Sequence, residues 1–255
     1  TIELTPSGSK TIFREQYAQI KSPEGVHDVF FVFSDESDMN IDFFVFSPYT
    51  GTESEEEKAD RMSWWRNDVY GMFIHFGAFS QLEGEYKGEK SVGGNKLAEW
   101  IMSNENISRE EYEEIAARPF NPVQFDVEKI VSLAKAAGHK YIVFTTKHHE
   151  GFNMYDTGVK GFEDYKITGF GEYKGEDPLK ALSEECQKQG VDLCAYITVM
   201  DWHDDSQSNY GKNVDPAKKA DFVSRYKAQL RELVEIYGAK ELWFDGDWES
   251  WWTKA

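Results

Sequence analysis

The chain has 255 residues, of which 40% are hydrophobic and 15% aromatic, and this excludes global disorder because it supplies ample apolar material for a packed core. Its 28 basic and 46 acidic residues give a formal net charge of −18, which repels a phosphate backbone, so we expect no nucleic-acid partner. No run approaches the ~18 apolar residues of a membrane span, so we expect no membrane partner either.

The first 50 residues have the composition of β-strands. Residues 26–33 and 40–47 are rich in valine, phenylalanine and isoleucine, and a polar, turn-like stretch separates them. A few short strands cannot bury both of their faces alone, so we expect a fragment of a β-sandwich. Residues 51–62 are acidic and predict a solvated linker, or the charged first turn of a helix.

From residue 63 to 255 the pattern alternates between strand and helix. Unbroken apolar strands that alternate with amphipathic helices imply an α/β fold with a parallel sheet. The predicted strands are 71–76, 141–146, 192–199 and 241–245, and the predicted helices are 99–102, 109–117, 125–138, 177–190 and 217–238.

The parallel sheet could belong to a barrel or to an open, doubly wound fold. No glycine-rich phosphate loop follows the first strand, which favours a (β/α)8 TIM-type barrel over a nucleotide-binding sheet. A full barrel needs about 250 residues, so we expect only its N-terminal half in this chain. Both ends are therefore expected to be cut from a longer protein.

Polar side chains capable of chemistry follow the predicted strands, where parallel sheets carry their functional groups. In the last strand, the two-residue period places Trp243 and Asp245 on one face. Asp245 could therefore meet a ligand, or it could be a structural carboxylate that caps a loop. The four groups are His75, His148–His149 with Glu150, Asp201–Trp202–His203, and Asp245 with Asp247.

The histidines allow several interpretations. His75 lies between apolar residues and could be a core histidine or a ligand. His148 and His149 are adjacent, so in an extended chain they would point opposite ways. Convergence of these three with His203 would permit a metal-dependent hydrolase, but the helical HExxH motif is absent from the sequence. We expect no metal and no cofactor.

All eight tryptophans follow the predicted linker, several of them near strand ends. Some must fill the core, but a tryptophan face can also cover the apolar C–H face of a sugar while histidine and carboxylate groups bind its hydroxyls. This combination favours a carbohydrate ligand over a nucleotide or an apolar molecule.

Several motifs between about residues 64 and 250 resemble one family in both order and spacing. They are WWRNDVYGMFIHFGAFS, AEWIM, FNPVQFDVEKIVSLAKAAGHKYIVFTTKHHEGF, the MDWH loop and ELWFDGDW. Together they resemble glycoside hydrolase family 29, the α-L-fucosidases. The resemblance implies retaining hydrolysis of terminal α-L-fucose from a fucosylated oligosaccharide or glycoconjugate, through a covalent fucosyl-enzyme intermediate.

The resemblance also implies roles for particular residues. It places the nucleophile at Asp245, and Tyr196 matches only part of a two-tyrosine motif, which leaves its role open. The family's acid/base residue follows the nucleophile, and since the chain ends ten residues past Asp245, we expect that residue beyond the C-terminus. A second chain or fragment could complete the barrel. The implied sugar-binding residues are His75, Glu99, Trp100, His148, His149, Trp243 and Tyr196.

The N-terminal strands resemble the closing strands of a family 6 carbohydrate-binding module. A sugar-binding module ahead of a fucosidase barrel fits a secreted or periplasmic glycan-degrading protein. The principal alternative is a non-catalytic fucose-binding or glycan-binding fragment, or a pseudoenzyme, which would lack the acid/base residue.

Overall fold

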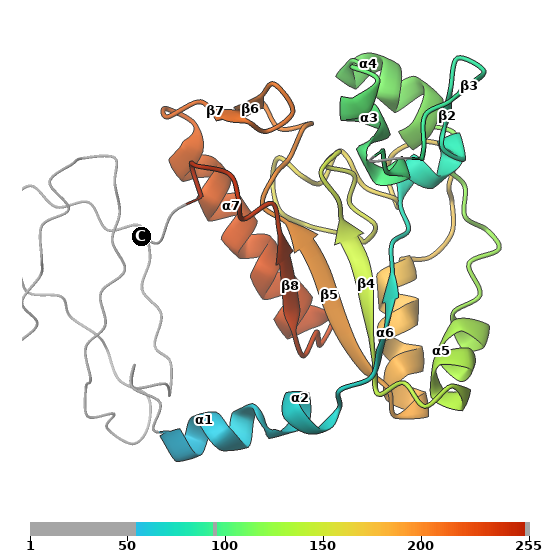
Figure 1. Ribbon diagram of the computed structural model, residues 1–255, viewed down its shortest axis with the longest axis vertical. Coiled ribbons are helices and arrows are strands. Elements are labelled where there is room, and N and C mark those ends of the chain that lie inside the picture. Colours follow the sequence, from blue (N-terminus) through green and yellow to red (C-terminus); the bar gives the residue numbers. More distant parts are fainter. Residues whose placement is uncertain (1–54, 94–95, 253–255) are drawn as a thin grey trace, which may run out of the picture. The chain divides into compact units, whose positions relative to one another are not determined.

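Four parallel strands form the main sheet in a computed structural model of this chain, in the order β1-β4-β5-β8 (Figure 1). The model describes residues 55–93 and 96–252, so the predicted β-sandwich fragment lies outside the described residues. The predicted parallel sheet is confirmed, with strand ends within two residues of the expected positions. The strands are β1 Gly71–Ile74, β4 Tyr141–Lys147, β5 Asp192–Thr198 and β8 Leu242–Asp245.

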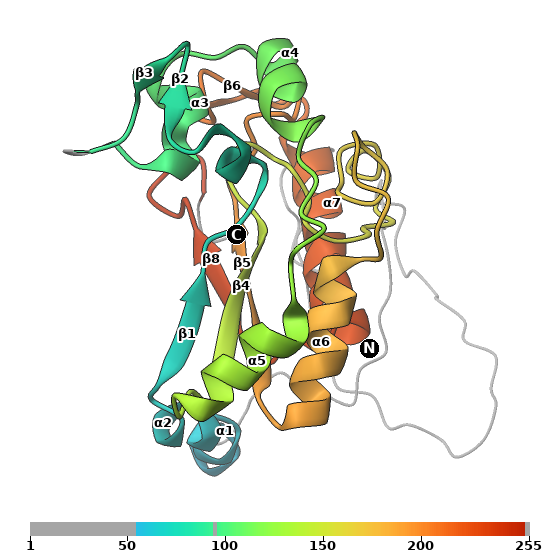
Figure 2. The ribbon, with the colours of Figure 1, turned by 90° about the vertical axis from the view of Figure 1, so that its right-hand side faces the viewer.

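Three longer helices lie on one face of this sheet (Figure 2). They connect successive parallel strands, as in repeated βαβ units. A π-helical turn, η4, extends the last of them. These elements are α5 Val127–Ala136, α6 Pro178–Gln189, α7 Lys219–Arg231 and η4 Glu232–Ile236.

The ends of α6 follow directly from its sequence. The Asp177 carboxylate accepts hydrogen bonds from the N–H groups of Leu179 and Lys180, at 2.9 and 3.2 Å. Pro178 occupies the first turn, where no intrahelical donor is needed. Gly190 ends the helix in a left-handed conformation with φ of +74°, which glycine adopts without strain.

The core lies between the sheet and these helices. Alternate residues of β4 and β5 enter it, so the remaining side chains, including Tyr196, belong to the opposite face of the sheet. Cys186 and Cys194 are free and buried. The strand residues of this core include Ile142, Phe144, Leu193, Ala195 and Ile197, which meet Leu179, Leu182, Phe222 and Leu233.

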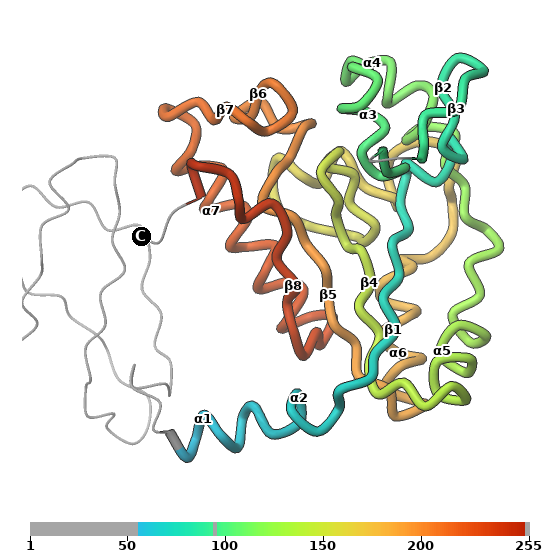
Figure 3. Tube along the Cα trace, viewed as in Figure 1, coloured from blue at the N-terminus to red at the C-terminus, as the bar shows by residue number. Residues whose placement is uncertain are grey.

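The shorter elements gather beyond the carboxyl ends of the strands (Figure 3). The helices predicted at 99–102 and 109–117 both form, although each is built from two kinds of helical turn. These shorter elements are η1 Ala78–Leu82, β2 Glu85–Tyr86, β3 Glu89–Lys90, η2 Ala98–Trp100, α3 Ile101–Asn104, α4 Arg109–Tyr112, the π-helical η3 Glu113–Ala117, β6 Gln207–Ser208 and β7 Asn213–Val214.

A separate compact unit ends at residue 67, and its described part contains α1 Glu55–Arg61 and α2 Ser63–Asn67. The acidic run therefore leads into the first turn of a helix, which was one of the two structures expected for these residues. Among the described residues, no helix combines the length and apolar character that crossing a membrane requires.

Candidate active site

A carboxylate at the end of β8 is the centre of the candidate site. The β5–β8 register pairs Tyr196 with Trp243 and Thr198 with Asp245, so these four side chains share the face opposite the helices. The Tyr196 hydroxyl donates a short hydrogen bond to Asp245 Oδ2, while Asp245 Oδ1 accepts the Gly246 N–H at 2.8 Å. Because 22% of the Asp245 side chain is exposed, the carboxylate is oriented yet accessible.

Tyr196 is held as a hydrogen-bond donor by its surroundings. Burial raises the pKa of Tyr196, and the hydrogen bond and negative charge of Asp245 raise that pKa further. The phenol therefore keeps its proton at neutral pH. A site role for Tyr196, which the sequence motif left open, is consistent with this contact.

His148 and His149 lie side by side, so the expectation that they point opposite ways is wrong. Their ring centroids are 4.3 Å apart and both are at most 2% exposed. Strand alternation fails here because the β4–β5 register shifts between Thr145 and Lys147, and β4 ends at Lys147. Both imidazoles therefore reach the same site.

Each of these histidines has a specific partner. His149 Nδ1 lies 2.6 Å from Thr198 Oγ1, and its Nε2 lies 3.6 Å from Asp245 Oδ2. His148 stacks on the Tyr196 ring at 5.3 Å. Thr198 was missed in the sequence because a threonine in an apolar strand carries no signal of a polar partner.

His75 and Glu99 complete the group. His75 follows β1 directly and is exposed, so its interpretation as a core histidine is wrong. Its ring lies 5.0 Å from that of Tyr196 and 5.5 Å from that of His148. Donor atoms of His75, Glu99 and His148 lie within 4.8 Å of one another. The structure thus brings together residues that are far apart in the sequence.

These donors could hold a metal ion or bind sugar hydroxyls. A second set, His148, His149 and Asp245, meets the same 4.8 Å limit, and two imidazoles with a carboxylate are a zinc-type ligand set. His203 does not join them, since its ring stacks on Tyr165 at 3.8 Å and its Nε2 lies 2.9 Å from Glu113 Oε1. The four-histidine convergence is therefore wrong.

Aromatic rings surround the histidines and the carboxylate. Trp100 lies edge-on to His149 at 4.8 Å, and Trp248 stacks near Trp100 at 6.3 Å. Trp243 contacts Phe73 edge-on at 5.1 Å and is 48% exposed. Exposed aromatic faces beside oriented polar groups are suited to a sugar.

Other tryptophans are structural. Trp251 packs on Phe222 at 6.0 Å and Trp252 on Tyr226 at 6.1 Å, so both cover α7. Sequence position alone could not separate Trp248 at the site from Trp251 and Trp252, because all three follow β8.

Burial favours the uncharged forms of His148, His149 and Glu150 at neutral pH. Desolvation lowers the pKa of His149 to about 4, against an opposing effect of the nearby Asp245. Desolvation also lowers the pKa of His148 well below its usual value and raises that of Glu150 to about 8. Neutral imidazoles can both donate and accept hydrogen bonds, as sugar hydroxyls require.

These shifts predict a stability maximum near pH 6.5. His149 and His148 bind fewer protons in the native than in the unfolded state, so stability rises with pH up to the ordinary histidine pKa. Glu150 binds more protons in the native state between pH 4.5 and about 8, so stability falls across that window. Above pH 6.5 only the Glu150 effect remains, and it predicts a loss of about 2 kcal/mol by pH 8.

Urea unfolding across this pH range measures the effect. Glu150→Gln keeps the size of the side chain without a titrating group, so it should remove the loss between pH 6.5 and 8. An unchanged alkaline decline in this variant would contradict the assignment to Glu150.

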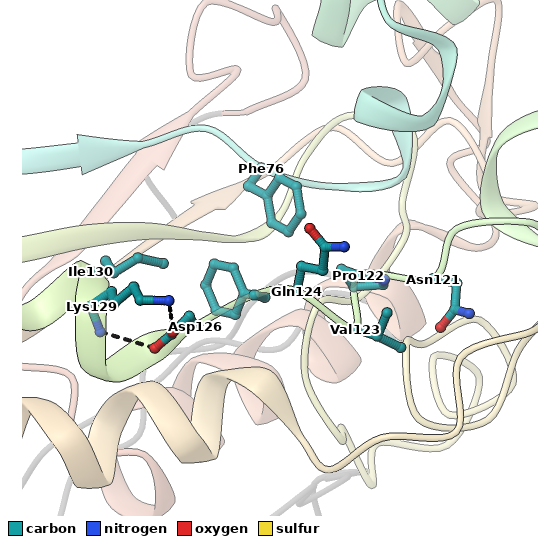
Figure 4. A pocket seen from close by; sticks show the side chains of 9 residues that line it. Phe76, Asn121, Pro122, Val123, Gln124, Asp126, Lys129 and Ile130 are labelled. Atoms are coloured by element: carbon teal, nitrogen blue, oxygen red, sulfur yellow. Dashed lines mark hydrogen bonds and ion pairs between the residues drawn. The ribbon is translucent and has the colours of Figure 1, made fainter.

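A hollow of about 510 Å³ lies outside this group of residues (Figure 4). It is lined by Phe76, Ile130 and residues 121–126. Its charged groups, Asp126 and Lys129, are paired with each other at 2.8 Å, and Asp126 also caps α5 through the Lys129 N–H. No histidine lines this hollow, so it lacks the polar groups that gather around Asp245.

Comparisons with known proteins agree on one family. A family model described as Alpha-L-fucosidase matches residues 45–255. The alpha-L-fucosidase of Dictyostelium discoideum is 27% identical over 199 residues, which cover 72% of this chain and 41% of that protein. Human tissue alpha-L-fucosidase is 28% identical over 204 residues, covering 73% and 40%. The chain thus spans about two fifths of the length of these relatives.

Solved structures give the same result. A GH29 alpha-L-fucosidase from Bacteroides thetaiotaomicron, trapped as a covalent intermediate with 2-fluoro-fucosyl fluoride, has a TM-score of 0.64 and 32% identity, covering 75% of this chain and 42% of that chain. Alpha-L-fucosidase AlfC from Lactobacillus casei, in complex with alpha-L-fucose, has a TM-score of 0.62 and 35% identity, covering 73% and 62%.

Proposed function

The chain belongs to the alpha-L-fucosidase family, and from this premise we propose that it hydrolyses terminal α-L-fucose from glycans with Asp245 as the nucleophile. One observation carries the proposal. The Tyr196 hydroxyl and the His149 imidazole converge on an accessible carboxylate at the end of a parallel strand. This contact supports Asp245 as an oriented nucleophile, beside the neutral imidazoles of His148 and His149 and a set of aromatic rings.

The reaction proceeds in two displacements. Asp245 Oδ attacks the anomeric carbon, the bond to the leaving oxygen breaks, and an acid supplies that oxygen with a proton. Water then attacks the anomeric carbon of the fucosyl-aspartate ester and returns a proton to the acid/base residue, which releases fucose and regenerates the carboxylate. Retaining enzymes place the acid/base carboxyl about 5–5.5 Å from the nucleophile, and we leave that residue unassigned.

Sugar recognition is divided between polar and aromatic groups. His75, His148, His149 and Glu99 supply hydrogen bonds to the hydroxyls of fucose. The faces of Trp100 and Trp243 cover its apolar side. The trapped intermediate of the Bacteroides thetaiotaomicron relative and the fucose complex of the Lactobacillus casei relative support a fucosyl group as the ligand.

Three broader proposals accompany this one. The four parallel strands, with helices on one face, form the first half of a TIM-type barrel. Residues 1–50 form part of a sugar-binding module. By binding the same glycan, this module would raise the effective concentration of fucosyl groups at the site. The protein is secreted or periplasmic, where such glycans are accessible.

Covalent trapping tests the function directly. In 2-fluoro-fucosyl fluoride the leaving group is fluoride, which departs without a proton, so the experiment requires only the nucleophile and the sugar pocket. We expect one fluorofucosyl group per chain in the intact mass, located on Asp245 by peptide mapping. A folded chain that binds L-fucose but takes no label would favour the glycan-binding alternative, and a label on another carboxylate would make the nucleophile assignment wrong.

Tyr196→Phe tests the contact that carries the proposal. A hydrogen bond to a charged group contributes about 1.5–3 kcal/mol, so its loss should lower kcat/KM for 4-nitrophenyl α-L-fucoside by about 10- to 100-fold. Tyr173→Phe is the matched control, because the Tyr173 hydroxyl donates to the Glu176 carbonyl oxygen instead. Equal kcat/KM values in the two variants would contradict a role for Tyr196.

A further inference from the structure

A lysine is completely buried directly before the two site histidines. Lys147 is the last residue of β4, and its side chain is 0% exposed. An ammonium group loses its hydration in such a place and must be paired. Lys147 Nζ donates to Asp201 Oδ2 and to Gln229 Oε1, both at 3.0 Å, and lies 4.4 Å from the centre of the Phe162 ring.

These contacts join three separate elements. Lys147 ends β4, Asp201 follows β5, and Gln229 belongs to α7. The contact network continues to the chain beyond the histidines, because Gln229 Nε2 donates to Asn153 Oδ1 at 2.7 Å. Asn153 in turn donates to the carbonyl oxygen of Tyr165 at 3.0 Å. Residues 147–153 are thus held at both ends by buried polar contacts.

Asp201 connects this network to the backbone of the site. Its Oδ1 accepts the N–H groups of His203 and Asp204, at 3.1 and 3.0 Å, which fixes the turn after β5. Within this turn, the Trp202 N–H donates to the His149 carbonyl oxygen at 2.7 Å. The position of His149 therefore depends on the same carboxylate that binds Lys147.

We propose that Lys147 is a positioning residue of the sugar pocket: its ammonium, held by Asp201 and Gln229, fixes the turn that presents His148 and His149. An apolar side chain could fill the same space, but only a charged donor with two fixed acceptors defines where the turn lies. The link to sugar binding rests on the function proposed above, while the effect on the two imidazoles does not.

The imidazoles themselves provide the first test. In ¹⁵N-detected NMR spectra without ligand, Lys147→Met should move or broaden the ring signals of His148 and His149, leaving that of His139 unchanged. Lys240→Met is the matched control, because it removes a lysine that pairs with Asp192 at 2.6 Å on the surface. Both of these side chains are 37% exposed. Unmoved His148 and His149 signals in Lys147→Met would overturn the proposal, whether or not the parent chain cleaves fucosides.

A double variant separates the positioning role of Lys147 from the cost of leaving the Asp201 carboxylate buried and unpaired. Lys147→Met with Asp201→Asn removes both charges and leaves no unpaired carboxylate in the core, so the double variant should unfold at a higher temperature than Lys147→Met alone. It therefore replaces the single variant in this test if the single variant does not fold. We expect its histidine signals to stay displaced and its dissociation constant for L-fucose to rise about 10- to 100-fold. Parental histidine signals in the double variant would overturn the proposal. A parent chain that does not bind L-fucose would count against the proposed function, and the imidazole signals would still decide the role of Lys147.

Discussion

Asp245→Ala is expected to lower turnover of 4-nitrophenyl α-L-fucoside by about 10⁴-fold or more, as removal of a covalent nucleophile does in other hydrolases. The aryl substrate isolates this residue, because nitrophenolate leaves without a proton and makes little demand on the acid. Release of nitrophenol, followed at a single temperature at which both proteins are folded, measures the effect.

Addition of azide is expected to give Asp245→Ala a new, measurable product. The lost carboxylate leaves space beside the anomeric carbon, where azide can attack once and give fucosyl azide of inverted configuration. Asp247→Ala is the control, because Asp247 is an exposed carboxylate two residues away. An equal loss in both variants, or turnover in Asp245→Ala close to that of the parent, would make the assignment of the nucleophile wrong.

Gly151→Ala is expected to be the most destabilising of the conservative changes around the site. Gly151 has φ of +84°, and an added Cβ would overlap Asp201 Oδ1 and approach the Cβ of His203 to 2.8 Å. The left-handed conformation costs about 1–2 kcal/mol for a residue with a Cβ. Crowding adds about 1–3 kcal/mol, because Asp201 is itself held by Lys147.

Gly138→Ala separates these two contributions. Gly138 has nearly the same φ, +85°, but an added Cβ there would meet nothing within 4 Å. Urea unfolding of both variants should therefore show a loss of about 1–2 kcal/mol in Gly138→Ala and about 2–5 kcal/mol in Gly151→Ala. Equal losses would mean that the contact with Asp201 does not constrain the turn.

The local elements were largely predictable because their signals are local. Apolar runs identified all four strands of the parallel sheet, and Asp177, Pro178 and Gly190 marked both ends of α6. The π-helical turns at the ends of two predicted helices were not foreseen, since residue composition does not distinguish them from α-helix.

The candidate site was predicted in its membership more than in its geometry. Strand alternation correctly placed Trp243 and Asp245 on one face, and the family resemblance named residues that the structure brings close together. The same alternation failed for His148 and His149, because a shift in register is a property of two paired strands and not of one. His203 carries the same chemistry, yet its stacking on Tyr165 keeps it out of the group.

By itself, the sequence determined the order of strands and helices, the ends of α6 and the family, because these depend on residue types and spacings along one chain. Only the tertiary structure decided which polar groups became partners and which lost their solvent. Two contacts, that of Lys147 with Asp201 and that of His149 with Thr198, join segments about 50 residues apart. The raised pKa of Glu150 depends mainly on desolvation. Neither long-range contact nor desolvation is visible in a linear pattern, because both arise only when the strands and loops are packed together.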